Sequence, residues 1–523
     1  MCSLSTLLFL VGLVLLQVDS ARILCVFPFP AVSHQNVFHT YNKEHLRRGH
    51  ELVVISPNPM KDRAPGNITE IDISHTYKML LNLKMDGVFV PKRGVITTMD
   101  SLTSVESYSQ LINMMTEQFN PPEVKKLIAY RHKEKFDLIV VEALPYMQTI
   151  YAHLFNAPLI LFSSLHGVPD HFEVMGAVSR HPTFYPYVYR HKHSNLNFFD
   201  KIQAVYDEFK LLRRNWAMDD IETEHLQRIF GKDALPIQEL KNRAELLFLT
   251  GHAIIGNNRP VPPNVIYLGS GIHLKPVKPL PEDLQAYLDD SKRGVVYVSL
   301  GTNVPTSLMD EDLLNAFLTA FARLPYDVLW KLDENNIPAE KLSKNIKIGK
   351  WFPQRDMLMH PNIKAFVTQG GAQSTDEAFN AKVPLVGIPM LGDQWYNTNK
   401  YVELRVGVKM DSFTMNADDL YNGIMRAVND PSFRENLAKL RDVLYDSPQT
   451  ALEKAVWWTE FVLRHKGAKH LRSPGANKIY TEYFMIDFIF YLGVMAVIAV
   501  VIVFALLRLI VKRLKIIGKE KKQ

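Results

Sequence analysis

The segment FVTQGGAQSTDEAF, residues 366–379, joins an apolar run to a polar run through two consecutive glycines. The apolar run is typical of a strand and the residues from Ser374 onward are typical of a helix, so the glycines occupy a tight turn. Free amides at a helix start bind anions, and Gln373 and Ser374 add side-chain donors beside them. The segment therefore predicts a phosphate-binding loop, with the neutral amide of Gln369 at its edge.

Apolar runs that alternate with helical segments surround this loop. A strand, a helix and a second strand within roughly 35 residues make a βαβ unit, the building block of doubly wound domains. The proline-dense segment 274–283 separates an earlier set from a later one, so we expect two α/β domains with a ligand cleft at the strands' carboxyl ends. The expected strands are ARILCVF, ELVVI, KFDLIVVEA and APLILFS in the first set, and GVVYVSLG, DVLWKL, NIKIG, IKAFVT and VPLVGIP in the second.

Residues 170–230 are rich in aromatic and basic side chains and show no clean period. We expect a solvated, irregular insertion here, with contact to a membrane or a substrate as the alternative. The first helix is expected in NVFHTYNKEHLRRGH, after the loop PFPAVSHQ.

Several common catalytic patterns are missing from the sequence. It contains no G-x-x-x-x-G-K-[ST], G-x-S-x-G or H-E-x-x-H, which excludes P-loop, hydrolase-elbow and zincin chemistry. Asp310 and Asp312 form a D-x-D pattern that could hold a metal, but acidic residues in a first helical turn also complement the helix dipole, and we favour that reading. The net charge of +6 is spread over 114 charged residues without a basic aromatic stripe, so nucleic acid is not an expected partner.

The amino terminus predicts a cleavable secretory signal over residues 1–20. Its apolar run, Leu7 to Leu16, is too short to span a bilayer, and an uncleaved anchor is the alternative. Cleavage would remove Cys2 and leave Cys25 alone, so no intramolecular disulfide is expected. Asn67-Ile68-Thr69 is a glycosylation sequon, with Asn67 as the acceptor.

The carboxyl terminus predicts a membrane span over residues 487–507. Twenty uncharged residues, 488–507, give about 30 Å of helix, one hydrocarbon core. Basic residues follow the span, so the tail is expected in the cytoplasm and the domains on the lumenal side. Lys519 and Lys521 resemble a dilysine retrieval signal of the endoplasmic reticulum; a basic stop-transfer flank is the alternative.

The motifs WFPQRDMLMHP and FVTQGGAQSTDEAFNAKVPLVGIPMLGDQWYN resemble, in order and spacing, the signature of the UDP-glycosyltransferases. The flanking segments RAELLFLTGHAIIGNNRPVPPNVIYLGSGIH and AVWWTEFVLRHKGAKHL are similar to those of animal, membrane-anchored members, and the glutamine variants look most like insect or insect-virus members. The resemblance covers essentially the whole chain. It implies a GT-B-type α/β fold, with two Rossmann-like doubly wound domains facing a cleft and one carboxyl-terminal transmembrane helix.

The resemblance also assigns roles to residues around the loop. Trp351 would lie against uracil with Gln354 beside it, Glu377 would accept both ribose hydroxyls, and Asp393 and Gln394 would bind the donor sugar. The residues expected at the diphosphate are Gly371, Gln373, Ser374, Gln369 and, as a second wall, Ser299, Gly301 and Thr302. Position 369 is usually histidine in the family, so its replacement by glutamine is expected to weaken one contact by about 1 kcal/mol.

On the acceptor side, His34 matches the family's catalytic base in AVSHQ. A histidine with a pKa near 6.5 suits removal of a hydroxyl proton at neutral pH. The family pairs this base with an acidic residue, usually Asp, and the aligned residue here is Glu142, which would orient the ring and stabilise imidazolium. The bland alternative makes Glu142 a structural contact. Asp137 is a competitor but should lie at the wrong end of its strand.

The resemblance therefore implies an inverting, metal-independent glycosyltransferase. It would transfer a hexose, glucose before glucuronate, from a UDP-sugar to a hydroxyl of a small lipophilic phenolic or steroid acceptor. It would work in detoxification or in hormone or pigment conjugation at the endoplasmic reticulum membrane. Assembly into a homo-oligomer is compatible with the resemblance. The alternative is a catalytically idle paralogue that binds UDP-sugar or lipophilic ligands.

The expected segments are a signal over 1–20, an acceptor domain over 21–273, a linker over 274–290, a UDP-sugar domain over 291–450, helices that pack back on the first domain and lead to the membrane over 451–486, the span 487–507 and the tail 508–523.

Overall fold

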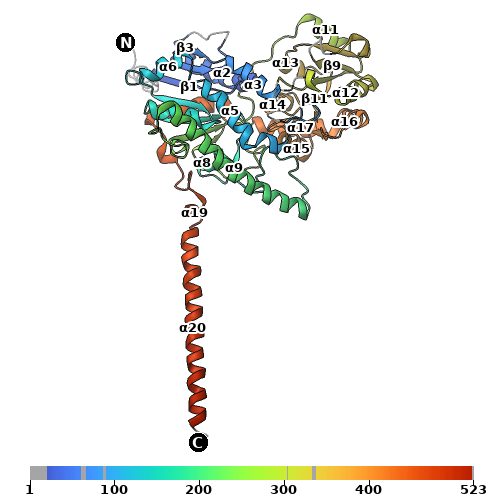
Figure 1. Cartoon of the computed structure of the whole chain (residues 1–523). Helices are drawn as coiled ribbons and strands as arrows, with labels where there is room; N and C mark the ends of the chain where they lie inside the picture. Colours follow the sequence, from blue (N-terminus) through green and yellow to red (C-terminus); the bar gives the residue numbers. More distant parts are fainter. Residues whose placement is uncertain are drawn as a thin grey trace, which may run out of the picture.

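The computed structural model describes residues 20–60, 66–85, 90–302, 304, 306–332 and 337–520. The expected signal lies outside these residues except for Ser20, and so does Lys521. Two sheets lie beside each other in the globular part, and one long helix leads away from it (Figure 1).

The first sheet has seven parallel strands in the order β3-β2-β1-β4-β5-β6-β7. Its inner strands are buried along almost their whole length, which is why they read in the sequence as continuous apolar runs rather than as alternating ones. Between β1 and β4 the strand order reverses, which opens a crevice at their carboxyl ends. The strands are β1 (Arg22–Val26), β2 (Glu51–Ser56), β3 (Ile68–Asp72), β4 (Leu138–Glu142), β5 (Leu159–Ser163), β6 (Ala244–Leu249) and β7 (Val265–Tyr267).

The second sheet has six parallel strands in the order β10-β9-β8-β11-β12-β13, so its reversal lies between β8 and β11. Both sheets thus show the doubly wound order that the alternating pattern predicted, and the two-domain α/β fold is confirmed. The strands are β8 (Val295–Ser299), β9 (Asp327–Lys331), β10 (Ile346–Gly349), β11 (Ile363–Thr368), β12 (Leu385–Gly387) and β13 (Gly407–Lys409).

Helices cover both sheets, as parallel sheets require. In the first domain they are α2 (Val32–Arg47), α3 (His75–Met85), α4 (Met99–Leu102), α5 (Val105–Glu117), α6 (Pro122–Ala129), α7 (Ile150–Leu154), α8 (Pro169–Met175), α9 (Phe198–Phe230) and α10 (Ile237–Lys241). In the second they are α11 (Glu282–Asp290), α12 (Glu311–Arg323), α13 (Gln354–Leu358), α14 (Ala372–Ala381), α15 (Gln394–Glu403), α16 (Ala417–Asn429) and α17 (Pro431–Tyr445). The last are α18 (Ala451–His465), α19 (Tyr480–Tyr483) and α20 (Ile486–Glu520), and short 3-10 helices span Tyr146–Thr149, Thr306–Leu308, Ala339–Lys341 and Lys469–Leu471.

Two helices begin earlier than the sequence indicated. Helix α2 starts at Val32, so His34 lies in its first turn and not in the preceding loop. Its N-cap residue, Ala31, offers no side-chain cap, so the sequence carried no signal for this start. Helix α14 starts at Ala372 instead of Ser374, because the backbone of Gly371 already serves as its N-cap. Both shifts bring more first-turn amides toward the carboxyl ends of the strands.

The irregular insertion expected over 170–230 is wrong for its second half. Residues Phe198–Phe230 form α9, a helix of 33 residues that begins with a capping box at Asn197. Its apolar residues did not reveal a helix because its buried positions include polar ones such as Asp207 and Glu208. The period of hydrophobicity therefore does not follow burial in this helix.

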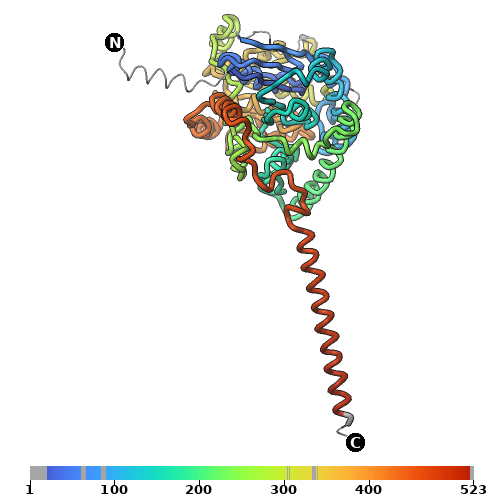
Figure 2. The backbone as a smooth tube through the Cα atoms, turned by 90° about the vertical axis from the view of Figure 1, so that its left-hand side faces the viewer, coloured from blue at the N-terminus to red at the C-terminus, as the bar shows by residue number. Residues whose placement is uncertain are grey.

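After α17 the chain returns to the first domain. Helix α18 packs against α2, where the Tyr41 and Thr459 hydroxyls are 2.8 Å apart. The stretch Ile486–Gly518 of α20 is long and apolar enough to cross a membrane. It extends away from the globular part in both views (Figures 1 and 2).

Candidate functional site

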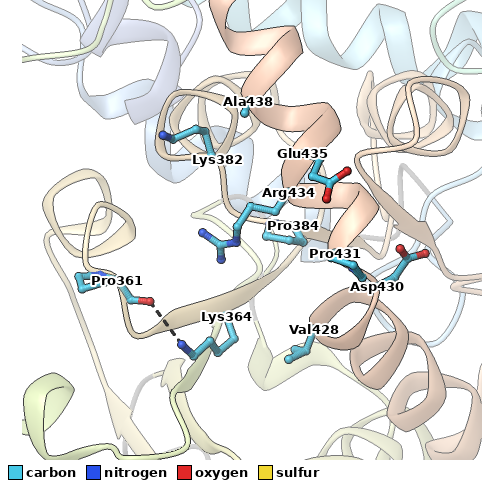
Figure 3. A pocket seen from close by; sticks show the side chains of 10 residues that line it. All are labelled: Pro361, Lys364, Lys382, Pro384, Val428, Asp430, Pro431, Arg434, Glu435 and Ala438. Carbon is cyan, nitrogen blue, oxygen red and sulfur yellow. Dashed lines mark hydrogen bonds between the residues drawn. The ribbon is translucent and has the colours of Figure 1, made fainter.

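A hollow of about 660 Å³ lies on the second domain and is lined by basic and acidic side chains (Figure 3). Pro361 and Lys364 stand at the amino end of β11, and Pro384 directly precedes β12. Lys364 Nζ donates to the carbonyl of Pro361 at 3.5 Å. Ligands of open α/β sheets bind at the opposite, carboxyl ends of the strands, so this hollow is not the candidate site.

A cavity of about 520 Å³ lies at those carboxyl ends and takes its walls from both domains. The sequence-predicted residues that line it are His34, Ser299, Gly301, Thr302, Trp351, Gln354, Gln369, Gly371, Gln373, Ser374, Glu377, Asp393 and Gln394. Glu142 lies directly behind His34, whereas Asn67 is exposed just before the edge strand β3 of the first sheet. The fold thus gathers residues more than 350 positions apart into one cavity.

His34 and Glu142 form a hydrogen-bonded pair at the crevice of the first sheet. His34 Nδ1 and Glu142 Oε1 are 2.7 Å apart, and the Glu142 side chain is buried, with 4% of the residue exposed. Glu142 Oε2 also accepts from the Phe29 amide at 3.1 Å, which fixes the carboxylate. Ser164 Oγ stands 2.9 Å from His34 Nδ1. With Nδ1 occupied, Nε2 is the ring nitrogen available to a ligand, because it has no hydrogen bond to any residue that the structure describes.

Asp137, the competing carboxylate, is at the other end of the same strand. Its Oδ2 accepts from the amide of Arg22 at 2.9 Å, at the amino end of β1. The sequence-based argument against Asp137 is therefore correct.

The turn from β11 to α14 presents backbone amides to the cavity. Gly370 has a φ of +88°, and a Cβ there would lie 2.6 Å from the Thr398 methyl, so the position requires glycine. Asn397 Nδ2 donates to the Gly370 carbonyl at 2.8 Å and holds the turn from below. Gly371 caps α14 without any side-chain cap bond, so the first-turn amides remain available to an anion.

Gln369 lies against the glycine of the facing loop. It is buried, with 7% exposed, and a Cβ added to Gly301 would come within 2.1 Å of its Nε2. Gly301 also has a φ of +75°. The carbonyl oxygen Oε1 of Gln369 is buried without a hydrogen-bond partner among the described residues. The side chain therefore fits between the loop after β8 and the turn into α14 and leaves unused hydrogen-bonding capacity there.

Gln373 is the predicted phosphate donor that the structure finds engaged elsewhere. The Gln373 side-chain Nε2 donates to the carbonyl of Ser164 in the first domain at 3.3 Å. The backbone carbonyl oxygen of Gln373 lies 3.2 Å from His273 Nε2. Burial lowers the pKa of His273 to about 4, so this ring is neutral. Gln373 thus bridges the two domains at the cavity.

Three predicted residues, Gln354, Ser374 and Glu377, form a hydrogen-bond network between α13 and α14. Gln354 Nε2 donates to Ser374 Oγ at 2.9 Å and to Glu377 Oε2 at 2.7 Å. Its Oε1 accepts from the Tyr297 hydroxyl at 3.2 Å. Burial raises the pKa of Glu377. The network holds a carboxylate and a hydroxyl side by side, a suitable pair for the hydroxyls of a sugar ring.

Trp351 offers a flat apolar surface at the cavity mouth. The residue is 67% exposed, unusual for so large an apolar side chain, and Lys331 Nζ lies 4.7 Å from its ring centroid. Lys331 Nζ also donates to the Gly301 carbonyl at 3.3 Å, and burial lowers its pKa. An aromatic face with a cation beside it suits a base linked to phosphate.

Asp393 and Gln394 differ in what they offer to a ligand. Asp393 Oδ2 accepts from Asn397 at 2.8 Å, and burial raises its pKa while the nearby His34 opposes that rise. Gln394 Oε1 accepts from the amides of Met390 and Leu391, both at 2.9 Å, so only its Nε2 faces a ligand.

Sequence reasoning missed several residues of the cavity. Lys331 and Tyr297 end or occupy ordinary-looking strands, and Ser164 follows β5 without any motif around it. Only the rule that parallel strands deliver their carboxyl ends to one edge could have indicated them. The cavity wall also includes the apolar and aromatic residues Phe29, Leu165, Tyr189 and Leu391.

The D-x-D pattern has a structural explanation in α12. Asp310 is the N-cap, and its Oδ1 accepts from the Leu313 amide at 2.7 Å. Asp312 is exposed in the first turn, where a carboxylate complements the helix dipole. The pattern is used for capping.

Comparison with known proteins is consistent with this geometry. The family described as "UDP-glucoronosyl and UDP-glucosyl transferase" matches residues 22–523. A protein of Spodoptera littoralis nuclear polyhedrosis virus, named ecdysteroid UDP-glucosyltransferase, is 40% identical over 484 residues, 90% of this chain and 93% of that protein. UDP-glucosyltransferase 2 of Dactylopius coccus is 31% identical over 481 residues, 91% of this chain and 90% of its own. The crystal structure of a UDP-glucose: anthocyanidin 3-O-glucosyltransferase with UDP aligns with a TM-score of 0.55 at 16% identity, over 86% of this chain and all of that one.

Proposed function

The chain belongs to the UDP-glucuronosyl and UDP-glucosyl transferase family, and we propose that it transfers glucose from UDP-glucose to a hydroxyl group of a lipophilic acceptor. The observation that carries the proposal is the His34–Glu142 pair, which faces the turn between β11 and α14 across one cavity. The first acceptors to test are ecdysteroids, because the similar viral proteins are named for them. The idle-binder alternative gains nothing from the site, since Glu142 makes the bond to His34 that a base requires.

The proposed reaction begins at His34. Its Nε2 takes the proton of the acceptor hydroxyl while Glu142 stabilises the imidazolium that forms. The acceptor oxygen attacks the anomeric carbon of the sugar, and the bond from that carbon to the UDP oxygen breaks on the opposite face. One such displacement turns an α-linked donor into a β-glycoside.

The UDP leaving group is proposed to depart toward preorganised hydrogen-bond donors. The amides at the start of α14 and the Ser374 hydroxyl would receive the negative charge of the diphosphate, where the helix dipole favours it. Trp351 would stack on uracil and Glu377 would accept from the ribose hydroxyls. Asp393 and Gln394 Nε2 would bind sugar hydroxyls. These donors need no metal ion to act, so a metal-independent reaction is part of the proposal.

The cellular setting is proposed from helix α20, the basic tail after it and the glycosylation sequon at Asn67. Helix α20 would anchor the protein in the endoplasmic reticulum membrane with both domains in the lumen and the basic tail in the cytoplasm. Asn67 is exposed, as a glycosylated asparagine must be. A role in detoxification or hormone conjugation would follow from the acceptor.

The test uses microsomes that contain the full chain. UDP release and glycoside formation are measured with UDP-glucose and with UDP-glucuronate, each with ecdysone or a simple phenol. We expect turnover with UDP-glucose and its loss in His34→Ala, whereas His132→Ala, at an exposed histidine in the turn after α6, keeps full activity. UDP binding without turnover on any acceptor would overturn the proposal, and turnover with UDP-glucuronate alone would overturn the choice of sugar.

A further inference from the structure

Helix α9 turns an apolar face outward along its first half. Seven large apolar or aromatic side chains recur there at spacings of one, three, four and seven residues, which places them on one side of the helix. Phe199 is 78% exposed, more than Trp351 at the cavity mouth. The exposed set, called here the α9 face, is Phe198, Phe199, Ile202, Val205, Tyr206, Phe209 and Trp216.

The opposite side of α9 carries buried polar side chains that bond to the protein, between buried apolar ones such as Leu211 and Leu226. Arg190 donates to Glu208 Oε1 at 2.9 Å, and Lys241 Nζ to Asp219 Oδ1 at 2.6 Å. Asn215 donates to the carboxylate of Asp170. A helix on an aqueous surface buries its apolar side and exposes its polar side. The first half of α9 departs from this pattern because large apolar side chains are exposed on its outer side, and the inward bonds leave it no freedom to rotate the α9 face toward the core.

The position of α9 relates this face to the membrane helix. The amino-terminal end of α9 projects from the lower edge of the globular part and reaches the level of α19, where α20 begins (Figure 1). Figure 2, turned about the same vertical axis, shows α20 leaving from that lower edge. Around α19, Ile479, Tyr483 and Phe484 are also exposed. The amino-terminal end of α9, where the α9 face begins, and the start of α20 therefore lie at one height along the axis of α20.

We propose that the α9 face lies in the boundary between lipid headgroups and acyl chains of the membrane that α20 crosses. The proposal rests on α20 being a membrane span. Interfacial helices combine large apolar and aromatic side chains with basic ones that reach lipid phosphates, and Lys201 and Arg213 are exposed along α9. Because α20 tethers the domains to the bilayer, even a weak preference of the α9 face for lipid leads to stable contact.

The membrane explains the α9 face better than a second copy of the chain does. A tethered domain always has a bilayer within reach at the level of α19, whereas contact with another copy depends on its concentration. Tyr and Trp on the face are the side chains that prefer the interface between lipid and water.

Docking of α9 would also fix the cavity relative to the bilayer. Tyr189 lines the cavity and lies nine residues before α9 begins. The connecting segment is held to the second domain, where Lys409 Nζ donates to the His191 carbonyl at 2.7 Å. The segment that connects Tyr189 in the cavity wall with the α9 face is therefore short, and it is held to the second domain at His191.

The test places a spin label on the full chain reconstituted at one copy per phosphatidylcholine nanodisc. Cys25 is buried and Cys2→Ser removes the other cysteine of the sequence, so an introduced cysteine is the reactive one. Ile202→Cys reports on the α9 face, and Asp312→Cys, exposed on α12 in the other domain, is the matched control. We expect the label at 202 to be severalfold more accessible to oxygen, which concentrates in lipid, than to a water-soluble nickel chelate, with the reverse at 312. Equal exposure of both labels to the nickel chelate would overturn the proposal.

A second arm separates lipid contact from self-association and from misfolding. Protection of the 202 label that vanishes at one copy per nanodisc and returns only at several copies per disc would assign the α9 face to a dimer and overturn the proposal. In the variant Phe199→Glu/Ile202→Glu/Phe209→Glu, a label at Tyr206→Cys should become accessible to the nickel chelate, whereas Arg228→Glu, at an exposed position near the carboxyl end of α9, should leave it protected. Both variants should keep turnover of a water-soluble phenol, because none of these residues lines the cavity. An unchanged label at 206 in the triple variant would also refute lipid docking.

Discussion

Replacing Glu142 by glutamine should disable the base while leaving its shape in place. Glu142 accepts two hydrogen bonds at once, one from His34 Nδ1 and one from the Phe29 amide. Glutamine has a single side-chain oxygen, and the Phe29 amide can only donate. If that oxygen faces Phe29, the side-chain NH₂ donates to Nδ1 and forces the proton onto Nε2, the atom that must accept a proton from the substrate. If it faces His34, two donors oppose each other at Phe29.

The size of the effect follows from the 2.7 Å contact. A hydrogen bond to a charged group contributes about 1.5–3 kcal/mol, and the attraction of two unit charges about 4 Å apart at an effective dielectric of about 20 is about 4 kcal/mol. A loss of about 2–4 kcal/mol of transition-state stabilisation lowers kcat by about 30- to 900-fold. The KM for UDP-glucose should hardly change, since Glu142 does not line the cavity.

The assay is initial-rate UDP release from membranes that contain equal amounts of each variant. Glu142→Asp, which keeps the charge and withdraws it by one methylene, should fall between wild type and Glu142→Gln. In the background of His34→Ala the Gln substitution should have almost no further effect, because both residues act as one unit. A Glu142→Gln enzyme with a kcat within threefold of wild type would show that the carboxylate only packs against the ring.

Three further substitutions test the donor side and the domain contact. Gln369→His restores the cationic donor and should lower the KM for UDP-glucose about fivefold at pH 6, for about 1 kcal/mol, but hardly at pH 8, where the ring is neutral; an equal effect at both pH values contradicts the charge argument. Trp351→Ala should weaken UDP binding by about 1–3 kcal/mol in calorimetry through lost stacking; an unchanged affinity would remove Trp351 from the uracil site. Burial raises the pKa of Asp376, which accepts from the Gly271 amide at 3.0 Å, to about 7. Its folded form keeps a proton that the unfolded chain releases near pH 4, so wild type loses stability as pH rises from about 4 to about 7. Asp376→Asn should remove this fall, so its melting temperature should gain on that of wild type between pH 5 and pH 8; a constant difference would contradict the raised pKa.

Where local chemistry decides structure, the sequence was sufficient. The buried parallel strands could be predicted from unbroken apolar runs, and the paired glycines at 370 and 371 indicated the turn into α14. The order of motifs was enough to indicate the family and to name thirteen of the residues that line the cavity, although it missed Lys331 and Tyr297. Residues 488–507 indicated a membrane span by length alone.

Where a helix start lacks a cap or its burial is polar, the sequence misled. Because the N-cap residue Ala31 gives no signal for the start of α2 at Val32, the sequence did not reveal that His34 lies in the first turn. The mixed inward side of α9 hid a 33-residue helix, because buried polar residues such as Glu208, which is paired with Arg190, interrupt its buried apolar ones.

The sequence by itself determined the two doubly wound domains, the glycine turn that opens α14 and the apolar helix long enough to cross a membrane, because each depends on interactions between near neighbours in the chain. Only the tertiary structure decided that Glu142 and Ser164 both reach His34, that Gln369 requires glycine at 301, and that Lys331 stands beside Trp351. Each of these is a contact between residues from different strands or loops. Their distance is set by sheet order and by domain packing, which no local pattern encodes.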